Sequence, residues 1–154
     1  MLMQQIMSEQ FAMDTDPTTI ADVVVRQIDT VKTLPYSSRA SMLLNDTFVL
    51  GYLTGFAEQA CRYKHNGERH DQNAQYMIRV LREVLENPES APAYATLSQS
   101  QENNSKFQHG CEIGQTDMND WFLSLGRFLP VNLAEYLNHR NEVMNVGKQR
   151  LSLS

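Results

Sequence analysis

The sequence predicts an all-α protein, a single-domain bundle of about five helices. Apolar residues recur at helical spacing in several segments, and no segment has the strict alternation of a strand. No internal repeat of roughly 20 to 50 residues is present. The length of 154 residues suits one domain with its own core. Residues 1–13 and 148–154 are expected to be tails, and 14–147 the folded domain.

The first two helices are predicted from their start signals and their apolar faces. Asp16 is suited to cap a helix that begins at Pro17, and the Leu34-Pro35 step is expected to end it. A longer second helix is expected from about 39 to 65. Because its apolar residues go nearly all the way round, this helix should be buried at the centre of the bundle.

Two glycines on the central helix predict a close helix contact. Gly51 and Gly55 are four residues apart and share a face, so a neighbouring backbone could approach closely. Another helix of the same chain is the favoured neighbour, because small residues at this spacing are a weak dimerisation signal outside membranes. The alternative is a homodimer interface at these glycines.

The third helix has the clearest amphipathic pattern in the chain. It is expected to run from about 71 to 86, after a turn at Asn66-Gly67. Since the turn is short, the second and third helices should pack as an antiparallel hairpin.

The second half of the chain gives weaker signals. A short helix containing Tyr94 and Leu97 is expected. The polar stretch that follows, at about 98–115, has few apolar residues and is expected to be a loop or excursion, with an exposed helix as an alternative. Thr116 is expected to cap the next helix, and Pro130 to kink it or to start the one after.

Composition and motifs exclude several classes of function. The formal net charge of −5 and the pI of about 5.3 disfavour nucleic acid as a partner. We expect a cytoplasmic protein without a membrane span, because no secretory leader or long apolar run is found and only two cysteines are present. Phosphate-binding loops and common hydrolase motifs are missing, which disfavours an enzyme.

A cluster of cysteine, histidine and glutamate provides the alternative hypothesis of a metal-binding protein or enzyme. Cys61 and His65 are four residues apart on one helix stripe with Glu58, and His109 and Cys111 form a second pair. Together they could make a Cys2His2 zinc site, or Cys111 could act as a nucleophile with a histidine base. The spacings match no standard zinc module, so no cofactor is expected in the main interpretation.

A basic segment provides a candidate contact surface for a partner or anion. Arg62, Lys64, Arg69 and His70 cluster within an acidic protein. The negative end of the second helix explains the first two as favourable placements, but it does not explain the last two, which lie past the turn.

The aromatic cluster of Trp121, Phe122 and Phe128 has two interpretations. Aromatic residues at helical spacing are usually core, whereas the single Trp of the chain could also anchor a partner or a second subunit. These observations together favour a small helical interaction protein, a regulator, adaptor or inhibitor. It would bind another protein through a helical surface, with a homodimer as one form.

Overall fold

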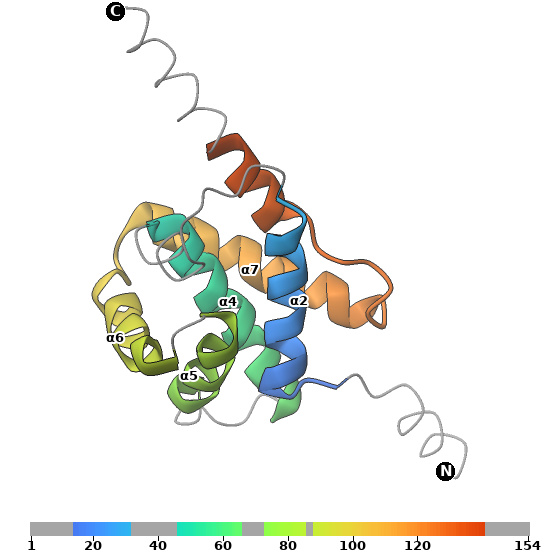
Figure 1. Ribbon diagram of the computed structural model, residues 1–154, viewed down its shortest axis with the longest axis horizontal. Coiled ribbons are helices and arrows are strands. Elements are labelled where there is room, and N and C mark those ends of the chain that lie inside the picture. The colour runs from blue at the N-terminus through green and yellow to red at the C-terminus, as the bar shows by residue number, and fades with distance from the viewer. Residues whose placement is uncertain (1–13, 32–45, 66–72, 86–87, 141–154) are drawn as a thin grey trace, which may run out of the picture.

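The computed structural model describes residues 14–31, 46–65, 73–85 and 88–140, and every regular element in these ranges is helical (Figure 1). The all-α prediction is therefore confirmed. The elements are α2 (Pro17–Asp29), α4 (Thr47–Lys64), α5 (Asn73–Val84), the 3-10 turn η2 (Pro88–Ser90), α6 (Ala91–Ser100), α7 (Ser105–Leu123) and a helical segment at 132–140. As predicted, α4 is central: it contacts α5, α6 and α7. α5 contacts α4, but it packs more extensively on α2.

α2 begins where the sequence predicts and ends earlier. Pro17 occupies its first turn, and Asp16 has the extended backbone of a capping residue. The predicted capping by the Asp16 side chain is wrong, because its carboxylate makes no hydrogen bond to the helix N–H groups and pairs with Lys64 instead. The helix ends at Asp29. There the hydroxyl of Thr30 donates to the carbonyl oxygen of Gln27 at 2.7 Å, so a side chain binds one of the last helix carbonyls.

α4 begins later than the sequence predicts, because Asp46 is its cap. The backbone of Asp46 is extended, and its carboxylate accepts the N–H of Val49 at 3.1 Å. The same carboxylate accepts the hydroxyl of Tyr136 at 2.9 Å and Nη1 of Arg140 at 2.9 Å. A helix running unbroken from position 39 to 65 is therefore wrong, and the contacts that hold Asp46 come from the far end of the chain.

The largest difference from the main prediction concerns residues 98–115. They form the end of α6, a turn at 101–104 and the first half of α7, a helix that is partly buried instead of a polar loop or an exposed helix. The side-chain oxygen of Asn104 caps α7 by accepting the N–H groups of Lys106 and Phe107. Thr116, the predicted cap, lies inside the helix. The buried residues of α7 are Phe107, Gly110, Gly114, Asp117, Met118 and Trp121. Because glycine and aspartate hold several of these positions, the buried face does not show as an apolar period.

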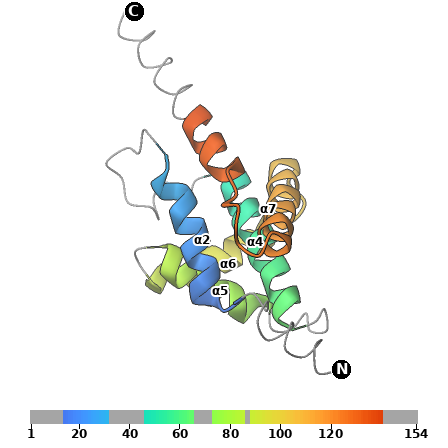
Figure 2. The ribbon, with the colours of Figure 1, turned by 90° about the vertical axis from the view of Figure 1, so that its right-hand side faces the viewer.

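Glycines bring α4 and α7 into backbone contact, and the two helices lie side by side (Figure 2). Gly51 and Gly55 of α4 face α7, while Gly110 and Gly114 of α7 face α4. The numbers of the contacting residues increase together along the two helices, so α4 and α7 are parallel. A Cβ atom added to any of the four would lie 2.1–2.2 Å from a backbone oxygen: Gly51 from Phe107, Gly55 from Cys111, Gly110 from Phe48 and Gly114 from Tyr52. We call this contact the glycine seam.

A buried polar network joins α2, α4, α7 and the 132–140 helix. The hydroxyl of Tyr52 donates to Oδ2 of Asp117 at 2.7 Å, and Nε2 of Gln27 donates to the same hydroxyl at 3.0 Å. Nδ2 of Asn132 donates to Oδ1 of Asp117 at 2.7 Å. Burial raises the pKa of the Asp117 carboxyl, while the hydrogen bonds from Tyr52 and Asn132 lower it. The Asp117 carboxylate thus binds Tyr52 and Asn132 directly, and Gln27 joins α2 to the network through the hydroxyl of Tyr52.

Candidate interaction surface

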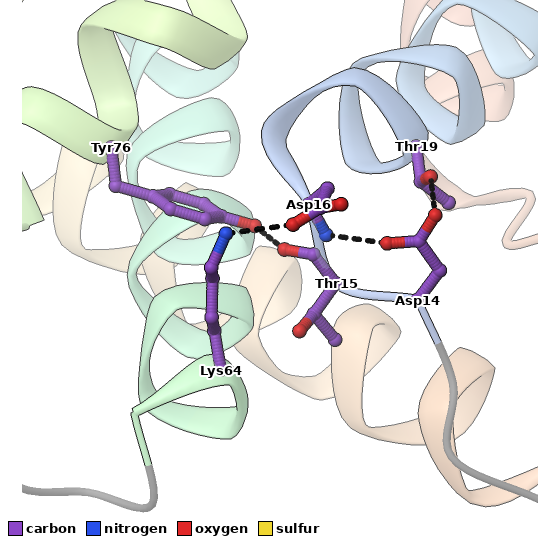
Figure 3. Close-up of polar contacts among 6 residues, drawn as sticks. All are labelled: Asp14, Thr15, Asp16, Thr19, Lys64 and Tyr76. Carbon is purple, nitrogen blue, oxygen red and sulfur yellow. Dashed lines mark hydrogen bonds and ion pairs between the residues drawn. The ribbon is translucent and has the colours of Figure 1, made fainter. Parts of the chain in front are cut away.

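The basic residues predicted as a contact surface lie at the end of α4 and beyond it. Arg62 is exposed. Lys64 forms an ion pair with Asp16, with 2.7 Å between Nζ and Oδ1, and its side chain is 29% exposed (Figure 3). Arg69 and His70 lie outside the described residues. Lys64 therefore joins the end of α4 to the start of α2 within the chain.

The surroundings of Lys64 are a junction of three helices (Figure 3). The buried hydroxyl of Tyr76 on α5 donates to the carbonyl oxygen of Thr15 at 2.6 Å. The carboxylate of Asp14 accepts the hydroxyl of Thr19 at 2.6 Å and the N–H of Asp16 at 2.9 Å. These hydrogen bonds lower the pKa of Asp14, that from Thr19 most. The contacts hold the start of α2 against α4 and α5.

The two other groups of predicted interface residues lie inside the protein. Trp121 is only 6% exposed and belongs to the hydrophobic core. Gly51 and Gly55 form the glycine seam with α7 of the same chain. Since α7 fills that face of α4, a second chain cannot reach these glycines while α7 is in place.

The residues of the zinc alternative do not converge on one point. Among the described residues, which include all five, no three His, Cys, Asp or Glu side chains are placed to hold one metal ion. The parallel register of the glycine seam is the reason. It sets Cys111 beside Gly55, and the ring of His109 lies 5.8 Å from that of Phe48. At about 1.5 Å per residue, Cys61 lies about 20 Å further along α4 than Phe48. The five residues of the zinc alternative are Glu58, Cys61, His65, His109 and Cys111.

Neither thiol has the environment of an activated nucleophile. Cys61 is buried, and burial raises its pKa above the ordinary value. Burial, with a smaller contribution from the nearby Glu58 carboxylate, raises the pKa of Cys111 to about 11, although Arg62 opposes the shift. A reactive cysteine needs a lowered pKa, because the thiolate is the nucleophile.

The exposed apolar side chains are concentrated in one short segment after the buried part of α7. In the rest of the described ranges, the large hydrophobic side chains are buried or partly buried. Single exposed apolar residues are normal, but several together mark contact sites. We call this group the 123–131 surface: Leu123 is 74% exposed, Leu125 41%, Phe128 73% and Val131 55%.

The 123–131 surface contains a strained backbone position. α7 ends in a Schellman motif, in which Gly126 N–H donates to Trp121 O at 2.9 Å and Leu125 N–H donates to Phe122 O at 3.1 Å. Leu125 takes the left-handed position of this motif, with a φ of 57°. Glycine is the usual residue there, since a side chain at left-handed φ costs about 1–2 kcal/mol. Leu125 is both strained and exposed, so stability alone would not select it, and strained residues cluster at functional sites.

We expect Leu125→Gly to be more stable than Leu125→Ala by about 1 kcal/mol. Both variants lose the same apolar side chain beyond Cβ, but only alanine keeps the strain at positive φ. In a regular helix the order is reversed, with alanine favoured by about 1 kcal/mol. Urea unfolding of the two variants measures the difference. Greater stability of the alanine variant would show that the left-handed conformation of residue 125 is wrong.

Sequence reasoning missed most of this surface because the apolar residues continue at helical spacing past the end of α7. Phe128 was grouped with Trp121 and Phe122 for that reason. Gly126 is the signal that could have found the end, because a glycine shortly after an apolar run marks a helix C-terminus. Because α7 ends at Leu123, the exposed residues Leu125, Phe128 and Val131 have no buried face of α7 to join.

None of the helices that the structure describes is long and apolar enough to span a lipid bilayer. No family model, curated protein or solved structure matches this chain.

Proposed function

We propose that this chain is a small helical protein-interaction module that binds another protein through the 123–131 surface. A regulator, adaptor or inhibitor acts in this way, by presenting a contact surface on a stable fold. The observation that carries the proposal is the concentration of exposed apolar side chains in one segment, with a strained leucine among them.

The segment is anchored at both ends, which favours binding. Before it, Trp121 is buried, and the flat ring of Phe122 stacks on Tyr63 with 3.8 Å between ring centroids. After it, Leu133 and Leu137 are fully buried. Because both ends are fixed to the core, little conformational freedom is lost when a partner binds.

The chemistry of the surface indicates an apolar partner site with a polar rim. Leu123 and Phe128 project large apolar side chains, of the kind that fill a pocket on a partner. Asp120 and Arg127, close to them in the sequence, are exposed as well, one acidic and one basic. With both signs present at its edge, the surface should bind through apolar burial, and its affinity should depend weakly on salt.

The proposal is tested by comparing two apolar-to-polar variants, Leu123→Ser and Phe128→Ser, with Glu112→Ser as a control on the exposed side of α7. Proteins captured from the source cells by the full chain are identified and purified, and the dissociation constant of each is measured. We expect the two apolar variants to weaken binding by at least about tenfold, and the control by less than about twofold. All three should unfold at nearly the wild-type temperature, because the replaced side chains are exposed.

Equal affinity of the wild type and both apolar variants for every captured protein would overturn the proposal. Light scattering over a range of concentrations tests the homodimer. A wild-type dimer that both apolar variants convert to monomer would assign the 123–131 surface to a second copy of the chain, against the proposal of a different partner.

A further inference from the structure

The chain returns to the side of α7 soon after leaving its end. Asn132, the first residue of the 132–140 helix, places its Nδ2 2.7 Å from Oδ1 of Asp117. Since α7 ends at Leu123, Asp117 lies about 9 Å before that end along the helix axis. The residues between the two helices, which we call the 124–131 loop, therefore close back on α7 and carry most of the 123–131 surface. Loops whose ends are held together in this way are frequently functional.

Local contacts hold the first half of the 124–131 loop. Beyond the Schellman motif, the N–H of Arg127 donates to the carbonyl oxygen of Ser124 at 3.2 Å. The hydroxyl of Ser124 donates to the carbonyl oxygen of Trp121 at 3.0 Å. These bonds join close neighbours in the sequence, so they extend the end of α7 without determining where the second half of the loop runs.

Contacts at longer range act on the second half of the loop. Leu129 packs against the hydrophobic core, but apolar burial is not directional and leaves the orientation of the chain open. The hydrogen bond from Asn132 to Asp117 spans 15 positions, and a hydrogen bond is directional. This bond therefore sets the path by which the loop returns to α7.

The acceptor of the Asn132 bond is fixed by two other helices. The Asp117 carboxylate is buried, and the hydroxyl of Tyr52 on α4 donates to its Oδ2 at 2.7 Å. Gln27 on α2 donates to that hydroxyl at 3.0 Å. A carboxylate bound at both oxygens has little freedom to turn, and hydrogen bonds to carboxylates are stronger than those to neutral acceptors. Asn132 thus attaches the loop to a rigid point of the core.

The conformation that this bond holds is unfavourable by itself. Leu125 has a positive φ, and Leu123 and Phe128 expose large apolar side chains to water. Without a directional restraint at long range, we expect the loop to sample conformations that relieve the strain or cover these side chains. A restraint of this kind keeps the apolar side chains presented to a partner.

We propose that Asn132 is a positioning residue for the 123–131 surface, because its bond to Asp117 holds the 124–131 loop in the conformation that binds a partner. This inference rests on the proposed function. The apparent affinity falls with the fraction of molecules that present the surface. Loss of the Asn132 bond should therefore slow association, whereas loss of a contact side chain such as Leu123 should speed dissociation.

The test compares Asn132→Asp with the exchanged pair Asp117→Asn/Asn132→Asp. In the single variant the donor is lost and two carboxylates face each other. In the exchanged pair, an amide at 117 can donate to a carboxylate at 132 and still accept the hydroxyl of Tyr52. Asn103→Asp is the control: it makes the same substitution at an exposed position, also close to a helix N-terminus, in the turn between α6 and α7.

The first measurement is nuclear magnetic resonance relaxation of the backbone amides of the full chain, on the fast and the microsecond-to-millisecond timescales. In Asn132→Asp, we expect order parameters below about 0.6 or exchange broadening at 127–131, with α5 unchanged. The exchanged pair and Asn103→Asp should resemble the wild type. An unchanged loop in Asn132→Asp would overturn the proposal. Equal loosening of α5 would overturn it too, because the bond would then support the whole fold.

The second measurement is the rate of binding to a captured and purified protein whose affinity Leu123→Ser weakens. Asn132→Asp should lower the association rate constant at least about fivefold and change the dissociation rate constant by less than about twofold. The exchanged pair should recover most of the association rate. Faster dissociation with unchanged association would overturn the positioning role, because it would mark Asn132 as a contact residue. An exchanged pair no better than Asn132→Asp would overturn it as well.

The two proposals fail in different ways. Equal binding by the wild type, Leu123→Ser and Phe128→Ser would overturn the proposed function, on which this inference rests. Weaker binding by these two surface variants, with the loop and the rates unchanged in Asn132→Asp, would overturn the role of Asn132 alone. If Asn132→Asp does not fold, Asn132→Ala takes its place, since it removes the donor without adding a second carboxylate.

Discussion

Gly55→Ala should lower the free energy of unfolding by more than about 3 kcal/mol, the largest effect we expect from adding one methyl group to this protein. The new Cβ atom would lie 2.1 Å from the carbonyl oxygen of Cys111 and 2.8 Å from its carbonyl carbon. These are backbone atoms of α7, so no side-chain rotation can relieve the overlap. The two helices must separate, and the core residues on both sides lose contact.

The sign of this effect makes the experiment decisive. Glycine to alanine inside a helix normally stabilises by about 1 kcal/mol, so the glycine seam must reverse the usual result. Glu112→Ala, on the exposed side of α7, controls for a general change in helix stability and should change it by less than about 0.5 kcal/mol. Urea unfolding measures both. A Gly55→Ala variant as stable as the wild type would show that α4 and α7 do not pack at this distance, whereas failure to fold would agree with the seam.

Tyr52→Phe should lower the free energy of unfolding by about 3 kcal/mol at neutral pH, because it removes a hydrogen bond from a buried carboxylate. The hydroxyl of Tyr52 donates to the carboxylate of Asp117. Because Asp117 is only 3% exposed, water cannot readily supply a replacement for this hydrogen bond. Burial already raises the pKa of Asp117, and the bond from Tyr52 partly opposes this shift. Losing the bond raises the pKa further.

The cost of Tyr52→Phe should therefore depend on pH. A carboxyl group with a raised folded-state pKa contributes stability below its unfolded pKa, and that stability is lost as pH rises through the folded value. In Tyr52→Phe the folded pKa is higher still, so the variant loses more stability as pH rises. The difference from the wild type should be largest at neutral pH and should shrink as the pH falls and Asp117 becomes protonated.

Tyr76→Phe is the matched control. Its hydroxyl is also buried, but it donates to an uncharged acceptor, the carbonyl oxygen of Thr15. The control should lower the free energy of unfolding by about 1 kcal/mol, with no dependence on pH between about 4 and 8. Denaturant unfolding across this range measures both variants. Parallel pH profiles for Tyr52→Phe and the wild type would contradict an ionised Asp117 at the centre of the network.

The sequence predicted those elements whose signals are local. Asp16-Pro17 marked the start of α2, and the amphipathic pattern placed α5 within a few residues of its observed bounds. The apolar residues on all sides of α4 correctly indicated a central helix. In each case the information lies within a few turns, where capping groups and side-chain spacing act.

The candidate site was much less predictable than the fold class. Lys64 belongs to a junction between helices, since its partner Asp16 lies 48 positions away. The sequence favoured the core for Trp121 and left a partner anchor as the alternative, and the structure places it in the core. Leu123 and Phe128 became candidates only once α7 was seen to end before the apolar pattern does. A local pattern indicates that a side chain is apolar, but it does not say which surface will cover it.

By itself, the sequence determined that this chain folds as helices around one buried helix, because helical periodicity and capping are properties of neighbouring residues. Only the tertiary structure decided that α7 extends through a polar segment. Gly110 and Gly114 have low helix propensity, but their close packing on α4 stabilises the helix there. Tertiary contacts also set the start of α4, where Arg140 binds Asp46 across 94 positions. Contacts between residues so far apart in the sequence depend on how the helices pack. The shape and polarity of entire helix faces determine that packing.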